Sequence, residues 1–71
     1  MSTIYTKEYK NVTQKLFKAR KESGLRQVDV AKKLGKQQSY VSKIEKGERR
    51  IDIVELKILA KIYNKKITYF I

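Results

Sequence analysis

The side chains of this protein offer hydrogen bonds and positive charge but little that could carry out catalysis. Its 71 residues include no His and no Cys, which removes the usual general base near neutral pH, the thiolate nucleophile and the commonest metal ligands. The acidic residues in the middle of the chain have helix-capping, ion-pair or surface explanations, and no base or nucleophile accompanies them. They are Asp29, Glu45, Glu48, Asp52 and Glu55. We therefore expect no enzyme, no metal site and no small-molecule cofactor.

A second group of polar side chains, between residues 38 and 46, is suited to the edges of base pairs. If Val41 and Ile44 face inward on a helix, steps of about 100° per residue place a polar set on the opposite face. That set is Ser39, Ser42, Lys43 and Lys46, with Gln38 at the side. Gln38 can donate and accept at once, which suits adenine, and Lys43 can donate to guanine. Taken alone, such a face is more often an ordinary solvated surface. The choice between that interpretation and a base-reading face therefore depends on the surrounding sequence.

The chain as a whole is strongly basic, with 18 Lys and Arg against 7 Asp and Glu and a net charge of +11. Such a surplus attracts polyanions, namely nucleic acid, an anionic membrane or an acidic protein. The apolar runs are too short to span a bilayer, and the N-terminus lacks the apolar core of a signal peptide. We expect a cytoplasmic, nucleoid-associated protein with no membrane partner. The few aromatic residues do not suit a stacking platform for single-stranded RNA.

Helical periodicity and glycine spacing predict a single all-α domain over residues 1–71. Helices are expected at about 7–23, 27–34 and 38–46, and the glycines that follow them are Gly24, Gly35 and Gly47. A fourth helix begins at Asp52, with Glu55 making a capping-box-like start. Its predicted inner face holds Ile53, Leu56, Leu59, Ala60 and Tyr63. The tail 67–71 fits either a last helical turn or a short strand.

The two short helices follow the spacing of a helix-turn-helix, at about 27–46. If Gln27 is the first position of the window, the apolar and small residues fall at the fourth, fifth, eighth, ninth, fifteenth and eighteenth positions: Val30, Ala31, Leu34, Gly35, Val41 and Ile44. Ala31 lets the two helices cross closely, and Gly35 supplies the positive φ of a short turn. The alternative is an ordinary helical hairpin, which this spacing together with the charge disfavours.

At these residues the sequence resembles the phage-repressor, Cro-like class of helix-turn-helix regulators. The resemblance runs from about Leu16 to Phe70, and its most specific piece is SKIEKG at 42–47. It implies a compact bundle of four or five helices, of the lambda-repressor-like type, that binds double-stranded operator DNA, usually as a dimer. The class includes restriction–modification controllers and antitoxins. The expected function is a sequence-specific transcriptional regulator, and the alternative is an antitoxin-type autoregulator that also binds a protein toxin.

The resemblance and the helix geometry together assign roles on the DNA. Positions matching Gln38, Ser39 and Lys43 commonly read bases in the family, and Ser42 joins them on the same face. Phosphate contacts are expected from the flanking residues Arg26, Gln27, Lys36, Gln37, Tyr40, Lys46, Arg49 and Arg50. Gln27 lies at a helix N-terminus, where amides and dipole favour an anion. For Tyr40 two readings stay open: its hydroxyl reaches a phosphate, or its ring covers the edge of the core.

Two further expectations concern how the helix at about 38–46, which would read the bases, and the helix before it are held in place. In the family, residues at the positions of Arg20 and Glu45 pair across the interior, so we expect a partly buried ion pair. Arg26 and Gln37 stand where Ser or Thr caps are usual, so both short helices are expected to lose caps worth about 1 kcal/mol each.

A second apolar stripe on the fourth helix suggests a homodimer. It consists of Val54, Ile58 and Ile62. The tail residues Ile67, Phe70 and Ile71 either cover part of this stripe within the monomer or join it, within the segment 64–71, at the dimer interface. A helix that is apolar on two sides needs two partners. The alternative is that a fifth helix covers the stripe within the monomer.

Overall fold

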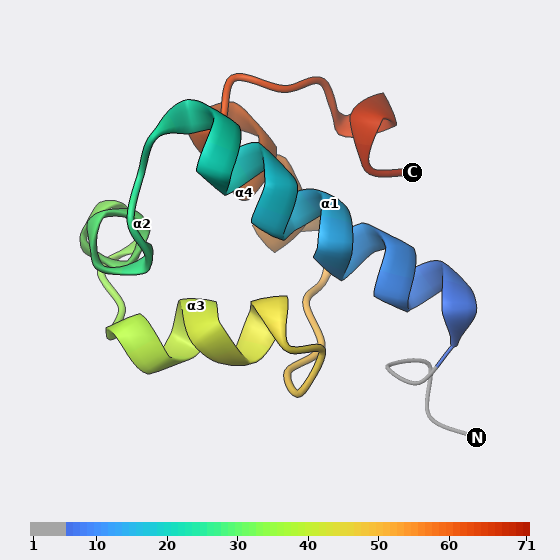
Figure 1. The fold of residues 1–71 in the computed structure, drawn as a ribbon, viewed down its shortest axis with the longest axis horizontal. Helices are drawn as coiled ribbons and strands as arrows, with labels where there is room; N and C mark the ends of the chain where they lie inside the picture. The colour runs from blue at the N-terminus through green and yellow to red at the C-terminus, as the bar shows by residue number, and fades with distance from the viewer. Residues whose placement is uncertain (1–5) are drawn as a thin grey trace.

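The computed structural model describes residues 6–71 as four α-helices and one 3₁₀ turn, with no strand in that range (Figure 1). The elements are α1 (Lys7–Ser23), α2 (Gln27–Leu34), α3 (Gln38–Glu45), α4 (Ile53–Ile62) and η2 (Ile67–Tyr69). The all-α prediction is confirmed, and the tail forms a short helical turn. Across residues 6–71, each helix is too short or too polar to cross a membrane.

The helix ends follow from local sequence. The Thr6 hydroxyl accepts the Tyr9 amide at 3.2 Å and so caps α1. Gly35 has a φ of 69°, and this left-handed residue allows the tight turn from α2 into α3. At the start of α4, Asp52 accepts the Glu55 amide at 2.8 Å and Glu55 accepts the Asp52 amide at 3.2 Å, as the capping-box pattern predicts.

The prediction that the N-cap side chain of each short helix makes no cap is confirmed at α2, where a different contact is found. A guanidinium cannot accept a hydrogen bond, so Arg26 itself caps nothing. Instead, the Asp29 carboxylate accepts the Arg26 backbone N–H at 2.9 Å and two guanidinium N–H groups at 3.0 Å. At α3 the prediction is confirmed, because the Gln37 side chain makes no capping hydrogen bond.

Each of the four helices contributes side chains to one core. The buried apolar residues are Leu16, Ala19, Val30, Ala31, Val41, Ile44, Leu56, Leu59, Ala60, Tyr63 and Phe70. α3 packs against α1 and α2, and η2 packs against α4. In Figure 1, α3 and the C-terminal segment lie on opposite sides of α1.

Two residues lie elsewhere than predicted. Ile53 was expected on the inner face of α4 but is 51% exposed, because it occupies the first helical position, where the core no longer covers it; Ile51 packs against the core instead. Phe70 was expected at a dimer interface but is only 2% exposed. η2 folds back on α4 and inserts this ring into the core, edge-on to Tyr69 with ring centroids 5.0 Å apart.

The apolar stripe of α4 is therefore partly covered within the monomer. Ile62 and Ile67 are half-buried against the core. The residues of the predicted interface that stay exposed are Val54, Ile58 and Ile71, at 60%, 46% and 69%.

Candidate nucleic-acid interface

α3 has one anchored side and one open side. Val41 and Ile44 are each 2% exposed and fix the helix to the core. Of the polar residues predicted to face outward, Gln38, Ser39, Lys43 and Lys46 are exposed and Ser42 is half-buried. α3 forms one edge of the molecule in Figure 1, and the exposure of these side chains shows that its polar face is turned to solvent.

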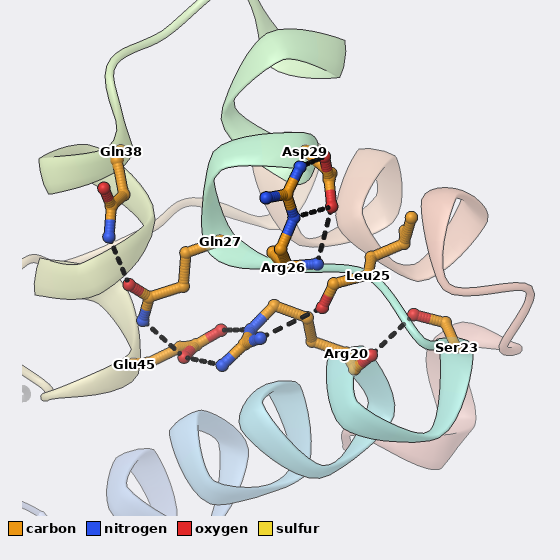
Figure 2. A network of polar contacts seen from close by, with 8 residues as sticks. All are labelled: Arg20, Ser23, Leu25, Arg26, Gln27, Asp29, Gln38 and Glu45. Carbon is orange, nitrogen blue, oxygen red and sulfur yellow. Dashed lines mark hydrogen bonds and ion pairs between the residues drawn. The ribbon is translucent and has the colours of Figure 1, made fainter.

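A chain of hydrogen bonds ties the start of α3 to the interior (Figure 2). The Gln38 amide donates to Gln27 Oε1 at 3.2 Å, and the Gln27 amide donates to Glu45 Oε1 at 2.9 Å. Gln27, for which a phosphate contact was predicted, is half-buried, and in this structure its side chain bonds to Gln38 and Glu45. The sequence feature that could have indicated this network is that each of the two short helices begins with a glutamine, Gln27 and Gln38.

The predicted Arg20–Glu45 ion pair is present beneath this network. Arg20 Nε lies 2.7 Å from Glu45 Oε2 and Arg20 Nη2 lies 3.1 Å from Oε1, a two-pronged contact. A third guanidinium bond goes to the Leu25 carbonyl at 3.0 Å, which ties the pair to the α1–α2 turn (Figure 2). The side chains are 9% and 6% exposed, and the hydrogen bond to Glu45 raises the pKa of Arg20. The pair therefore joins α1, α3 and the turn before α2.

The Tyr40 side chain makes contacts within the protein. Its hydroxyl donates to Glu55 Oε2, and its ring packs against the core edge. The Arg49 guanidinium lies 4.6 Å from the ring centroid and 4.0 Å from the same Glu55 oxygen. Of the two readings, these contacts support the one in which the ring covers the edge of the core.

Most of the other predicted phosphate-contacting residues lie at the surface around α3. Exposed side chains are those of Arg26, Lys36, Gln37, Lys46, Arg49 and Arg50. Arg26 is 75% exposed although it pairs with Asp29, and this pairing lowers the pKa of Asp29 to about 2. Lys36 and Arg49 both lie against the Tyr40 ring, so two cationic side chains gather beside the first turn of α3.

Tyr9 is a residue that sequence reasoning did not single out as functional. From α1, its hydroxyl donates to the Arg49 carbonyl at 2.8 Å and accepts the Ile51 amide at 3.1 Å. Burial raises the pKa of this hydroxyl. No local pattern could have revealed the contact, because the partners are 40 and 42 residues away along the chain.

Comparison with known proteins gives one match. A family model described as helix-turn-helix matches residues 16–70, which include the ion pair, both short helices and the loop that follows them. No curated protein and no solved structure matches the chain significantly.

Proposed function

The chain belongs to the helix-turn-helix family, and on that premise we propose that it is a sequence-specific transcriptional regulator of the repressor or controller type. The family match supports binding to double-stranded DNA. The observation that carries the proposal is α3 itself, whose apolar side is anchored by Val41 and Ile44 while its polar side is open.

On the DNA, α3 enters the major groove, which is about 12 Å wide and admits one helix. The residues that read bases are Gln38, Ser39, Ser42 and Lys43. Around them, Arg26, Lys36, Gln37, Lys46, Arg49 and Arg50 contact phosphates, together with the amides at the α2 N-terminus. Each neutralised phosphate adds about −0.9 to the slope of log affinity against log salt.

The protein binds as a homodimer through the exposed part of α4. Val54, Ile58 and Ile71 supply an apolar surface in a chain that is otherwise rich in charge, which is the kind of patch that marks association. A symmetric dimer would place two α3 helices on half-sites about 34–36 Å apart.

The experiment that tests the function is selection of bound sites from random duplexes at physiological ionic strength. The proposal predicts enrichment of a site with two related half-sites. It also predicts that the selected duplex binds at least about 10³-fold more tightly than a scrambled duplex. Equal affinity for the selected and scrambled duplexes would overturn it.

A further inference from the structure

The Tyr9 hydroxyl holds two neighbouring peptide groups at once. The carbonyl of Arg49, which accepts from the hydroxyl at 2.8 Å, belongs to the peptide bond that precedes Arg50. The amide of Ile51, which donates to the hydroxyl at 3.1 Å, belongs to the peptide bond that follows Arg50. One side chain from α1 therefore fixes the peptide groups on both sides of a single arginine.

This arrangement restricts the backbone at Arg50. Because peptide groups are planar, the backbone at Arg50 has two soft dihedral angles, and fixing both adjacent planes restricts both of them. Upstream, the amides of Glu48 and Arg49 donate to the Lys43 carbonyl at 2.9 and 3.2 Å. Downstream, the Asp52 amide donates to Glu55. Tyr9 holds the part of the loop that lies between these two stretches, from the Arg49 carbonyl to the Ile51 amide.

The two arginines of this loop differ in what holds their side chains. Arg49 lies over the Tyr40 ring and near Glu55, so its guanidinium is positioned by the protein. Arg50 is exposed, and its guanidinium forms no hydrogen bond or ion pair with residues 6–71. What the protein fixes at Arg50 is therefore the backbone from which the side chain projects, and Tyr9 holds that backbone.

We propose that Tyr9 is a positioning residue for DNA binding, which orients Arg50 toward a phosphate beside the major groove occupied by α3. The planar fork of a guanidinium matches phosphate oxygens well, and a loop backbone that is ordered in advance loses less entropy on binding. This inference rests on the proposed function, because it requires the α3 face to be the DNA-binding face. Tyr9 acts through Arg50 and needs no DNA contact of its own.

The test compares Tyr9→Phe with wild type on a short duplex carrying the selected site and on one of scrambled sequence, over a series of salt concentrations. The ring of Tyr9 stays in place and both loop hydrogen bonds are lost. Affinity for both duplexes should fall about 3- to 10-fold, the factor expected for neutral hydrogen bonds. The salt slope should flatten by up to about 0.9, the contribution of one phosphate. Amide exchange at Ile51 should accelerate.

Three control variants separate positioning from a general structural effect. Tyr69→Phe removes a hydroxyl at the C-terminal end, across α1 from α3, and should bind like wild type. Arg50→Ala should weaken both duplexes and flatten the salt slope. In the double variant, Tyr9→Phe should add nothing to Arg50→Ala, because the contact that it positions is already gone. A structural effect alone would leave the salt slope unchanged and would add to Arg50→Ala.

Each result supports or overturns the inference. It is overturned if Tyr9→Phe keeps the wild-type salt slope, if its effect adds to that of Arg50→Ala, or if Arg50→Ala binds like wild type. Rapid amide exchange at Ile51 in the unsubstituted protein would also overturn it, and that measurement needs no variant to fold. If wild type itself does not prefer its selected duplex, the proposed function is what has failed.

Discussion

At the scale of single residues, Gln38 shows how a side chain can be fixed and still available. One N–H of its amide is held by Gln27, and the amide oxygen points away from that bond (Figure 2). The free oxygen can accept a hydrogen bond from the N6 amino group of adenine, and the second N–H can donate to adenine N7. Since the conformation is already set by Gln27 and Glu45, less side-chain entropy is lost on binding.

Replacing Gln38 should therefore change specificity more than general affinity. Gln38→Ala is expected to relax the preference at one base pair by about 1–3 kcal/mol, because a two-pronged contact is lost. The measurement is a set of dissociation constants for single-base variants of the selected site. An equal loss on every sequence, scrambled DNA included, would show that Gln38 does not read a base.

The Arg20–Glu45 pair is expected to act on stability. Its side chains are 9% and 6% exposed, so Glu45→Gln leaves a nearly buried guanidinium without its counter-charge. We expect a loss of about 3 kcal/mol in the free energy of unfolding, measured by urea titration.

The matched control for that change is Glu22→Gln. Glu22 pairs with Lys65 at 3.0 Å, but the two side chains are 45% and 29% exposed, so solvent screens the pair and little stability should be lost. If the two variants unfold at the same urea concentration, the Arg20–Glu45 pair does not hold α3 to the scaffold.

At the scale of elements, most of the fold could be predicted because helix signals are local. Gly35 and the Asp52–Glu55 box each depend on residues within one turn, and they mark helix ends where the structure has them. The Arg20–Glu45 pair was foreseeable from the family resemblance. The roles of Tyr9 and Tyr40 were not, because their hydroxyl groups bond to segments that only tertiary packing brings near.

The prediction that Phe70 lies at a dimer interface was wrong for a related reason. Periodicity shows that Phe70 is on an apolar side but does not show what covers it. A turn that folds back buries the ring in the monomer, whereas a straight extension would have presented it to a partner. The same limit applies to Ile53, where the helix pattern continues past the edge of the core.

The start of α2 should make stability depend on pH. Hydrogen bonds from Arg26 lower the pKa of Asp29 from its ordinary 3.8 to about 2. Because the folded pKa lies below the unfolded pKa, the stabilisation is fully present above about pH 4 and is lost as the pH falls toward about 2. Urea unfolding of wild type and Asp29→Asn across this range measures the effect.

In that comparison the wild type should lose stability more steeply than Asp29→Asn as the pH falls. The variant lacks the titrating carboxylate, so this part of the pH dependence disappears. Parallel curves for the two proteins would mean that the Arg26–Asp29 contact does not survive in solution.

At the scale of the whole molecule, charge and assembly govern how α3 meets its site. A net charge of +11 raises the rate of encounter with DNA and makes binding sensitive to salt, without by itself selecting a sequence. In the proposed function, selection depends on α3 and on the distance between two copies of it, which the proposed α4 interface would set.

The dimer can be tested with two substitutions of equal exposure. Ile58 on α4 and Phe17 on α1 are both 46% exposed. Ile58→Ser should weaken self-association in sedimentation and abolish cooperative binding to a duplex with two half-sites, while leaving binding to one half-site unchanged. Phe17→Ser should do neither. If both variants sediment and bind alike, α4 is not the interface.

In the proposed complex the open face of α3 lies against base edges, and proton contacts between protein and DNA report on this arrangement. Nuclear Overhauser effects between the protein and its selected duplex should connect Ser39 and Lys43 side chains with base protons of the major groove. Contacts from these side chains to sugar protons alone, or base contacts arising from another face of the protein, would contradict this arrangement.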